Sequence, residues 1–283
     1  MWVYVNDHFV SEEKATVSAF DSGFLYGNGL FETLRSYNGK IFLLTEHLTR
    51  LQKGAKRLAI PIPDSTILEK RLIETLKKNQ LRDAMLRLTI TSGKQGWHGL
   101  GASQKIAPPT LIIFARGNAG YPESVYQKGM TGQIVTIRRN PKTAQDPALK
   151  AISFLNNVMA RREALEDSAN EAILLNTKGD LAEGGISNLF WVRKGRLYTP
   201  SMSVGILAGV TRNLVLKLAK KEQLFVTEGF YKKAALLHAD EAFLTNTGFE
   251  VMPLVRVNQK KIGNGKPGPM TKQLHQAFLK QIK

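Results

Sequence analysis

Residues 148–190 read ALKAISFLNNVMARREALEDSANEAILLNTKGDLAEGGISNLF, and this stretch decides how the rest of the chain is interpreted. Lys150 stands between apolar neighbours on both sides. An apolar environment disfavours the charged form of a lysine, and a neutral amine can attack a carbonyl to form a Schiff base. Glu183 follows a strand-like EAILLN and a turn at residues 178–180. A carboxylate in such a place could keep the nitrogen of a pyridine ring protonated.

A lysine for an aldehyde and an acid for a ring nitrogen are two requirements of a pyridoxal phosphate site. The alternative interpretation is a surface charge, because the chain has 40 Lys and Arg residues and lysines are seldom buried. Lys150 and Glu183 alone therefore give a weak signal. The motifs around them give a much more specific one.

The chain resembles the fold-type IV pyridoxal phosphate enzymes, which include branched-chain aminotransferases, D-amino-acid aminotransferases and 4-amino-4-deoxychorismate lyases. The motifs that carry the resemblance are, in chain order, YGNGLFETLR, LLTEHLTRL, LKAISFLNN, AEGGISNLFWV, YTPSMSVGILAGVTRNLV and DEAFLTNTGFEVMPL. They cover nearly the whole chain. The resemblance implies an α+β, two-domain fold-type IV structure, like that of D-amino-acid aminotransferases, with the cofactor in the interdomain cleft.

The resemblance also implies a role for each matching residue. Lys150 is the catalytic lysine that carries pyridoxal 5'-phosphate, and Glu183 faces the ring nitrogen. The other residues expected to bind the cofactor are Leu207, packed on the ring, and Arg50, Val210, Thr211 and Thr247, which hold the phosphate. Val210 and Thr211 stand at a predicted helix start, where backbone N–H groups and the helix dipole favour an anion.

Two predicted strands of the N-terminal half carry the candidate substrate-binding residues. Alternation over residues 30–37 puts Phe31, Thr33, Arg35 and Tyr37 on one face, and Leu30, Glu32, Leu34 and Ser36 on the other. In residues 85–91, Arg87 faces away from the apolar side chains. Arg35 is either a surface cation or a group that holds a carboxylate. We expect Thr45 to be the N-cap of the helix that contains Arg50.

The composition excludes several other classes. The chain of 283 residues has no cysteine and five histidines, so disulfides and thiolate metal sites are excluded and we expect no metal. It shows no signal peptide and no membrane span, so we expect a cytoplasmic protein. The net charge of +17 is spread along the chain without a nucleic-acid-binding motif, and we expect neither nucleic acid nor membrane as a partner.

Linker-like composition in ARGNAGYPES predicts two domains. We place an N-terminal α/β domain at residues 1–117, a linker at 118–123 and a C-terminal cofactor-anchoring domain at 124–283. A Gly-rich loop is expected at residues 93–104. The resemblance implies a homodimer in which the partner borders the site.

Two reactions remain open for such a site. We favour an aminodeoxychorismate lyase, which releases pyruvate to give 4-aminobenzoate for folate biosynthesis, because Arg35 and Arg87 could hold the substrate's two carboxylates. The alternative is a class IV aminotransferase that acts on D-amino acids or branched-chain amino acids. Leu155 stands where branched-chain aminotransferases carry a tyrosine. Phe31 and Ser92 stand where D-amino-acid aminotransferases usually carry tyrosine and arginine.

Overall fold

The computed structural model describes residues 1–94 and 108–282, so most of the predicted Gly-rich loop lies outside the described residues. Helices and strands are mixed throughout, which confirms the predicted α+β class. The chain forms two compact units. Unit 1 comprises Met1–Ala119 and Leu149–Phe154, and unit 2 comprises Gly120–Ala148 and Leu155–Lys283. The return of six residues around Lys150 to unit 1 was not expected from the sequence.

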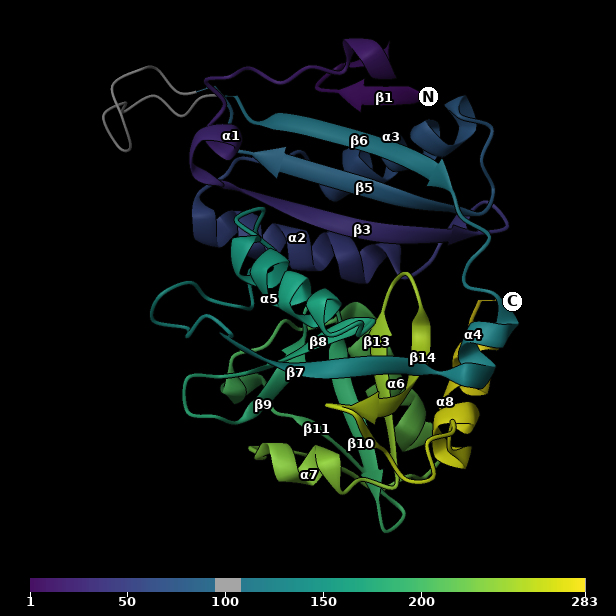
Figure 1. Cartoon of the computed structure of the whole chain (residues 1–283). Helices are drawn as coiled ribbons and strands as arrows, with labels where there is room; N and C mark the ends of the chain where they lie inside the picture. The colour runs from purple at the N-terminus through teal and green to yellow at the C-terminus, as the bar shows by residue number, and fades with distance from the viewer. Residues whose placement is uncertain (95–107, 283) are drawn as a thin grey trace. The chain divides into compact units, whose positions relative to one another are not determined.

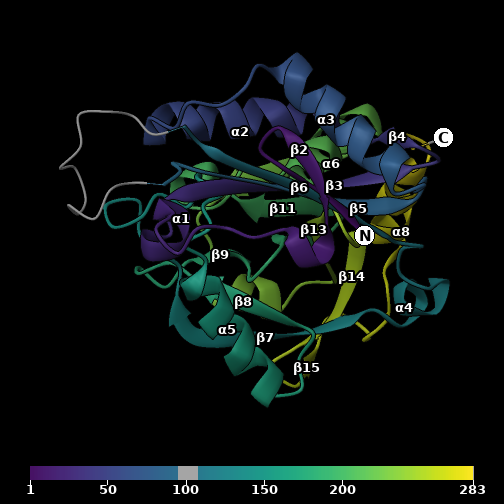
Figure 2. The same cartoon turned by 90° about the horizontal axis from the view of Figure 1, so that it is seen from above.

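Unit 1 is built on a six-stranded antiparallel sheet of order β2-β1-β6-β5-β3-β4 (Figure 1). Its strands are β1 Trp2–Val5, β2 His8–Ser11, β3 Gly29–Tyr37, β4 Lys40–Ile41, β5 Ala84–Thr91 and β6 Thr110–Gly117. Its helices are η1 Glu12–Lys14, α1 Ser22–Tyr26, α2 Leu44–Leu58 and α3 Ser65–Lys78. Helices α2 and α3 lie on the same side of this sheet (Figure 2).

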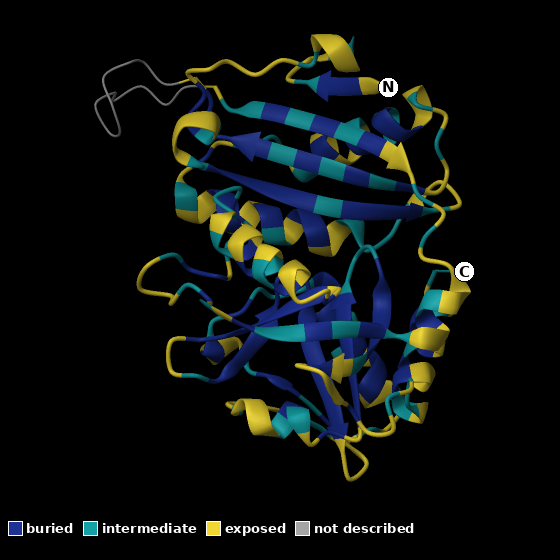
Figure 3. Ribbon diagram, viewed as in Figure 1, coloured by how far each residue is buried: buried dark blue, intermediate teal, exposed yellow. Residues whose placement is uncertain are grey.

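The two faces of this sheet differ in polarity. Buried and half-buried residues alternate along β5 and β6 (Figure 3). Leu86, Leu88 and Ile90 are fully buried in the core beneath α2 and α3. Arg87 and its neighbours on the opposite face are half-buried. This confirms the predicted alternation, and it leaves a polar face on the side of the sheet away from the two helices.

The start of α2 differs from the prediction. The helix begins at Leu44, and its N-cap is Leu43 in a left-handed conformation (φ 51°) without a side-chain cap. Thr45 is therefore inside the helix, and its prediction as N-cap is wrong. The reason is that Phe42 still donates its backbone N–H to Arg35, at 2.9 Å. Only Leu43 therefore separates the hydrogen bond to β3 from the first helical residue, Leu44. Its left-handed conformation makes the sharp change of chain direction between the two.

Unit 2 is built on a nine-stranded sheet of order β12-β11-β10-β13-β14-β7-β8-β9, with β15 also paired to β14. The parallel pairs are β11–β12, β14–β7 and β7–β8. The strands are β7 Met130–Arg138, β8 Glu171–Leu175, β9 Leu181–Gly184, β10 Asn188–Arg193, β11 Arg196–Pro200, β12 Val226–Gly229, β13 Glu241–Asn246, β14 Glu250–Val257 and β15 Lys260–Lys261.

Helices pack around the sheet of unit 2. They are α4 Glu123–Lys128, α5 Leu155–Glu166, η2 Met202–Val204, α6 Val210–Lys221, α7 Lys233–Leu237 and α8 Pro269–Leu279. Helix α5 contacts β7 and β8, whereas α6 and α8 contact one another and β13. Strand β8 is buried along its whole length; it lies between β7 and β9, and α5 contacts it. None of the helices in the described residues is both long and apolar enough to cross a membrane.

Candidate active site

Four of the predicted substrate-binding residues lie on the polar face of unit 1. Phe31, Thr33 and Arg35 project from β3, and Arg87 on β5 is directly paired with Thr33. The Arg87 guanidinium donates to the hydroxyls of Thr89 at 3.3 Å and Thr33 at 3.5 Å. Its central carbon lies 3.4 Å from the centre of the Phe31 ring, a cation–π contact. Burial lowers the pKa of the Arg87 guanidinium to about 10, so it remains charged at neutral pH.

Lys150 lies on the same face. Its carbonyl accepts the backbone N–H of Phe31 at 3.0 Å, and Ile152 donates to the carbonyl of Gly29 at 3.0 Å. The segment therefore lies alongside β3, and the Lys150 Nζ is 4.4 Å from the centre of the Phe31 ring. Gly29 permits this approach, because a Cβ there would lie 2.8 Å from the Ile152 Cδ1. The Lys150 amine and the Arg87 guanidinium thus both lie against the Phe31 ring.

On the opposite face of β3, Glu32 forms a buried ionic cluster with α2. Its side chain is fully buried and accepts two hydrogen bonds from Arg50, at 2.6 and 2.7 Å. The Nδ1 of His47 lies 2.7 Å from the Glu32 Oε2. Burial alone would raise the pKa of the Glu32 carboxyl, but Arg50 and His47 lower it to about 2. The Arg50 guanidinium, which was predicted to bind the cofactor phosphate, is therefore paired with Glu32 within unit 1.

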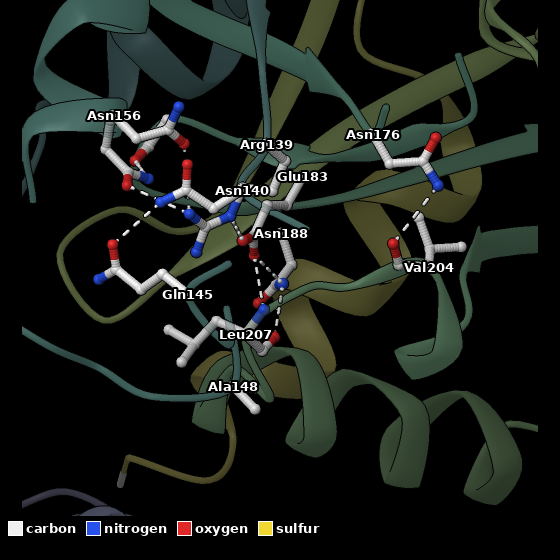
Figure 4. A network of polar contacts seen from close by, with 12 residues as sticks. Arg139, Asn140, Gln145, Ala148, Asn156, Asn176, Glu183, Asn188, Val204 and Leu207 are labelled. Atoms are coloured by element: carbon white, nitrogen blue, oxygen red, sulfur yellow. Dashed lines mark hydrogen bonds and ion pairs between the residues drawn. The ribbon is translucent and has the colours of Figure 1, made fainter. Parts of the chain in front are cut away.

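In unit 2, Glu183 is the centre of a second buried network (Figure 4). Its Oε1 accepts from the Arg139 Nε at 2.7 Å. Its Oε2 accepts from the Asn188 side chain at 3.2 Å and from the backbone N–H of Leu207 at 3.0 Å. Since these donors fix both oxygens, the carboxylate cannot rotate freely. A fixed, buried carboxylate is suited to accept a hydrogen bond from a cationic ring.

The turn after Glu183 is held by a second buried acid. Glu171 on β8 accepts the Ser187 hydroxyl at 2.9 Å and the Arg161 guanidinium at 3.0 Å. Gly184 must be glycine here, because a Cβ would lie 2.0 Å from the Ser187 Oγ. Burial raises the pKa of the Glu171 carboxyl, and Arg161 opposes this only in part. Glu171 therefore anchors the β9–β10 turn that presents Glu183.

The start of α6 has the features of an anion site. Its N-cap is Gly209, which has no side chain to cap the first backbone N–H groups of the helix. Val210 and the buried Thr211 are the first two helical residues. Glycine is required at 209, because a Cβ there would lie 1.9 Å from the Asn188 Oδ1. Thr245 pairs with Asn188 across β10 and β13, and its buried Oγ1 has no hydrogen-bond partner among the residues that the structure describes.

Thr247 lies in the turn between β13 and β14 and is half-buried. No hydrogen bond joins it to Thr211 in the part of the chain that the structure describes. The backbone N–H of Leu207 donates a hydrogen bond to the Glu183 carboxylate. Arg139 and Asn188 were not predicted as site residues; Asn188 stands in AEGGISNLFWV, one of the motifs that carry the resemblance, whereas Arg139 lies outside those motifs.

Comparison with known proteins identifies the family. Residues 29–257 match the model of the amino-transferase class IV family. An aminodeoxychorismate lyase of Bacillus subtilis is 40% identical, over 99% of this chain and 94% of its own length. A putative branched-chain-amino-acid aminotransferase of Methanocaldococcus jannaschii is 39% identical, over 98% of this chain and 95% of its own. The chain therefore belongs to the class IV aminotransferase family.

Solved structures agree with this assignment. The branched-chain amino acid aminotransferase of Escherichia coli superposes with a TM-score of 0.94 at 29% identity, and the match covers 99% of this chain and 93% of that one. The branched-chain amino acid aminotransferase from Thermobaculum terrenum, solved in its PLP-form, matches with a TM-score of 0.89 at 26% identity, over 99% and 93% of the two chains. The predicted family, fold type and pyridoxal phosphate cofactor are confirmed.

Proposed function

We propose that this class IV enzyme is an aminodeoxychorismate lyase that uses pyridoxal 5'-phosphate, releases pyruvate and leaves 4-aminobenzoate. The observation that carries the proposal is the polar face of unit 1, where the Arg87 guanidinium and the Lys150 amine meet over Phe31. Arg35 lies on the same face of β3. A substrate with two carboxylates needs two such cations, whereas a simple amino acid has one α-carboxylate.

The residues present fit the cofactor. The uncapped start of α6 and the unpartnered hydroxyl of Thr245 suit a phosphate, and Glu183 suits a protonated ring nitrogen. In the proposed site, Val210, Thr211, Thr247 and Arg50 would hold the phosphate, Glu183 would accept a hydrogen bond from the ring nitrogen, Leu207 would pack on the ring, and Lys150 would be the point of attachment. When bound, the cofactor supplies an electron sink for the carbanion formed at the substrate.

The chain's own residues perform the remaining tasks. Lys150, as a neutral amine, takes the proton from the substrate carbon that bears the amino group. Arg35 and Arg87 hold the two carboxylates and so fix which bond is aligned for cleavage. Elimination then breaks the ring C–O bond. The departing enolpyruvate takes up a proton to become pyruvate, and the ring becomes aromatic.

The names of the relatives alone do not choose between the reactions, because an aminodeoxychorismate lyase and a putative branched-chain-amino-acid aminotransferase are about equally similar to this chain. A D-alanine aminotransferase of Bacillus licheniformis is 34% identical over the whole chain and 97% of its own length. The alternative proposal is therefore a transaminase that acts on D-amino acids or branched-chain amino acids. In it, Arg87 would hold a single α-carboxylate.

The deciding experiment supplies aminodeoxychorismate without any keto acid and measures 4-aminobenzoate and pyruvate in equal amounts. A lyase sustains many turnovers under these conditions. A transaminase stops after about one turnover per site until a keto acid is added, and it converts D-alanine or L-valine efficiently. The second pattern, with no pyruvate from aminodeoxychorismate, would replace the lyase by the transaminase.

Variants test the substrate contacts separately. Arg87→Gln should raise the Michaelis constant for aminodeoxychorismate about tenfold or more, since a hydrogen bond to a charged group contributes about 1.5–3 kcal/mol. Arg116→Gln is the matched control, because Arg116 is an exposed arginine of the same sheet, paired with Glu12. Equal effects of the two substitutions would remove Arg87 from the substrate site.

We further propose that the enzyme is a homodimer. The apolar side chains of α1 support this, because Phe24 is 75% exposed and Leu25 and Tyr26 are also exposed. Sedimentation velocity at micromolar concentration should show a dimer for the wild type and dissociation for Phe24→Ser. A monomeric wild type with full activity would contradict the proposal.

A further inference from the structure

Unit 2 contains a hollow of about 380 Å³ that none of the residues proposed for the cofactor or the substrate lines. It lies beside the start of β7, the turn that precedes β8 and the hairpin of β14 and β15. Strand β14 pairs with β7 and with β15, and Figure 2 shows these strands on the same side of the unit. The volume is within the range of pockets that hold small metabolites.

The charge of this hollow is strongly positive. Lys128, Arg256 and Lys261 line it, and Asp167 is the one acid among its lining residues. Within residues 1–94 and 108–282, none of the three cations forms a hydrogen bond or ion pair through its side chain. A few surface cations elsewhere in the described residues do have such partners, as Lys232 has in Asp180 at 2.6 Å. The three cations therefore remain available to an anion from outside the chain.

Two of these cations stand directly opposite each other. Arg256 and Lys261 are paired residues of β14 and β15. Directly opposite residues of an antiparallel pair project to the same side, and like charges in these positions repel. The aliphatic stem of Lys261 also packs over Gly265, where a Cβ would lie 3.1 Å from the Lys261 Cδ. The repulsion is therefore built into the hairpin, and an anion between the two side chains would relieve it.

The walls of the hollow are held in place before any ligand binds. The side chain of Asn258, in the β14–β15 turn, accepts the backbone N–H of Ile134 on β7 at 2.6 Å. The side chain of Asn170, before β8, accepts the backbone N–H of Thr131 at 2.8 Å. Both turns are thus fastened to β7. A preformed site lowers the ordering cost of binding.

We propose that this hollow binds a small organic dianion, a phosphate ester or a dicarboxylate, at a site separate from the reaction. Arg256 offers two parallel N–H groups to one anionic oxygen pair, and Lys128 and Lys261 offer point charges. Uncharged donors are also present, namely the amides of Gln133 and Gln259 and the hydroxyls of Thr131 and Ser168, which line the hollow. A dianion is matched to three cations and one acid, whereas a neutral ligand would leave the opposed pair uncompensated.

The experiment uses the cofactor-loaded enzyme, so that the cofactor's own phosphate site is filled. Calorimetric titration with inorganic phosphate, O-phosphoserine and succinate, at constant ionic strength, measures binding and separates the phosphate from the dicarboxylate source. Arg256→Gln and Lys261→Gln should each weaken binding of the preferred anion about tenfold or more. Lys260→Gln is the matched control, because this neighbouring lysine is exposed but does not line the hollow. It should bind as the wild type does.

A second measurement separates a binding role from a structural one. Without anion, Arg256→Gln should raise the thermal midpoint or leave it unchanged, since it removes a repulsion. With phosphate, only the wild type and Lys260→Gln should gain a higher midpoint. Binding that is equal in all three lysine and arginine variants, or absent from the wild type, would overturn the proposal. So would a preference for an oligonucleotide over every small dianion, which would mark the patch as a nucleic-acid surface.

Discussion

Replacing Glu32 with glutamine should be among the most destabilising conservative changes in unit 1. The carboxylate is fully buried, and both of its oxygens accept hydrogen bonds from Arg50. Glutamine keeps the size and shape but removes the charge. Its amide NH₂ would then face the donors of Arg50 and His47. The substitution thus leaves a largely buried guanidinium without its counter-charge.

Two routes lead to a similar magnitude. Breaking a buried ion pair by removal of one partner costs about 3–5 kcal/mol. Independently, the pKa of Glu32 falls from an ordinary value of 4.5 to about 2. At about 1.4 kcal/mol per tenfold change in affinity for a proton, this corresponds to a contribution of roughly 3 kcal/mol to the free energy of unfolding. We therefore expect Glu32→Gln to lower that free energy by about 3 kcal/mol.

The effect should depend on pH with a definite sign. The pKa of Glu32 is lower in the folded than in the unfolded state, so the unfolded state binds the proton more readily. The contribution of Glu32 is complete above about pH 4.5 and is lost as the pH falls toward 2. The stability of the wild type should fall on acidification over this interval. The difference between wild type and Glu32→Gln should shrink with it.

Urea unfolding of the wild type and of Glu32→Gln, measured at pH 7, 4 and 3, would test both expectations. Glu46→Gln is the control, since Glu46 is an exposed acid of the same helix, and it should change stability by no more than about 0.5 kcal/mol. A loss below about 1 kcal/mol for Glu32→Gln would refute the importance of the charge. A large loss that does not shrink at low pH would show that shape, and not ionisation, is what Glu32 contributes.

Three further outcomes are expected. Lys150→Ala should lose nearly all turnover and the visible absorbance of the bound cofactor, measured by absorption spectroscopy beside the exposed-lysine control Lys142→Ala. Arg139→Gln leaves the buried Glu183 without its cationic partner and should lower the free energy of unfolding by about 3–5 kcal/mol, measured by urea unfolding; near-wild-type stability would show that Asn188 and the Leu207 N–H suffice. For Glu171, burial raises the pKa, so wild-type stability should fall relative to Glu171→Gln as the pH rises from 4 to 8; the opposite trend in paired unfolding curves would contradict this.

Local patterns in the sequence correctly predicted the two strands that carry the candidate substrate-binding residues. Alternation over residues 30–37 and 85–91 placed Phe31, Thr33 and Arg87 on one face, as β3 and β5 do. These predictions succeed because side-chain direction in a strand depends only on position along it. The same rule left Glu32 unexplained on a face that it shares with Leu30 and Leu34. Its partners come from a helix 15 and 18 residues further on, and no pattern within the strand contains them.

The parts of the site that the sequence did not predict depend on contacts across long intervals. Arg139 meets Glu183 across 44 residues, and Asn188 reaches the backbone of Leu207 across 19. Residues 149–154 return to unit 1 to pair with β3, although their neighbours in the chain belong to unit 2. Such pairings are decided by sheet order, which local periodicity does not encode. A motif resemblance can name Lys150, but it does not show that Phe31 supports it.

The net charge of +17 is not divided evenly between the interior and the surface of the protein. Among the described residues, the buried acids are Asp21, Glu32, Asp146, Glu171, Asp180, Glu183, Glu241 and Glu250, whereas the buried lysines and arginines are Arg35, Arg139 and Arg212. More acids than cations are withdrawn from solvent, so the surface is more basic than the composition alone suggests. Such a surface raises the local concentration of anions. Both proposed ligands, a substrate with two carboxylates and a dianion in the hollow, are anions. The exposed cations thus attract such ligands at long range. Half-buried or buried arginines such as Arg87 and Arg139 act at short range, because a guanidinium that is fixed in place determines where a neighbouring carboxylate lies.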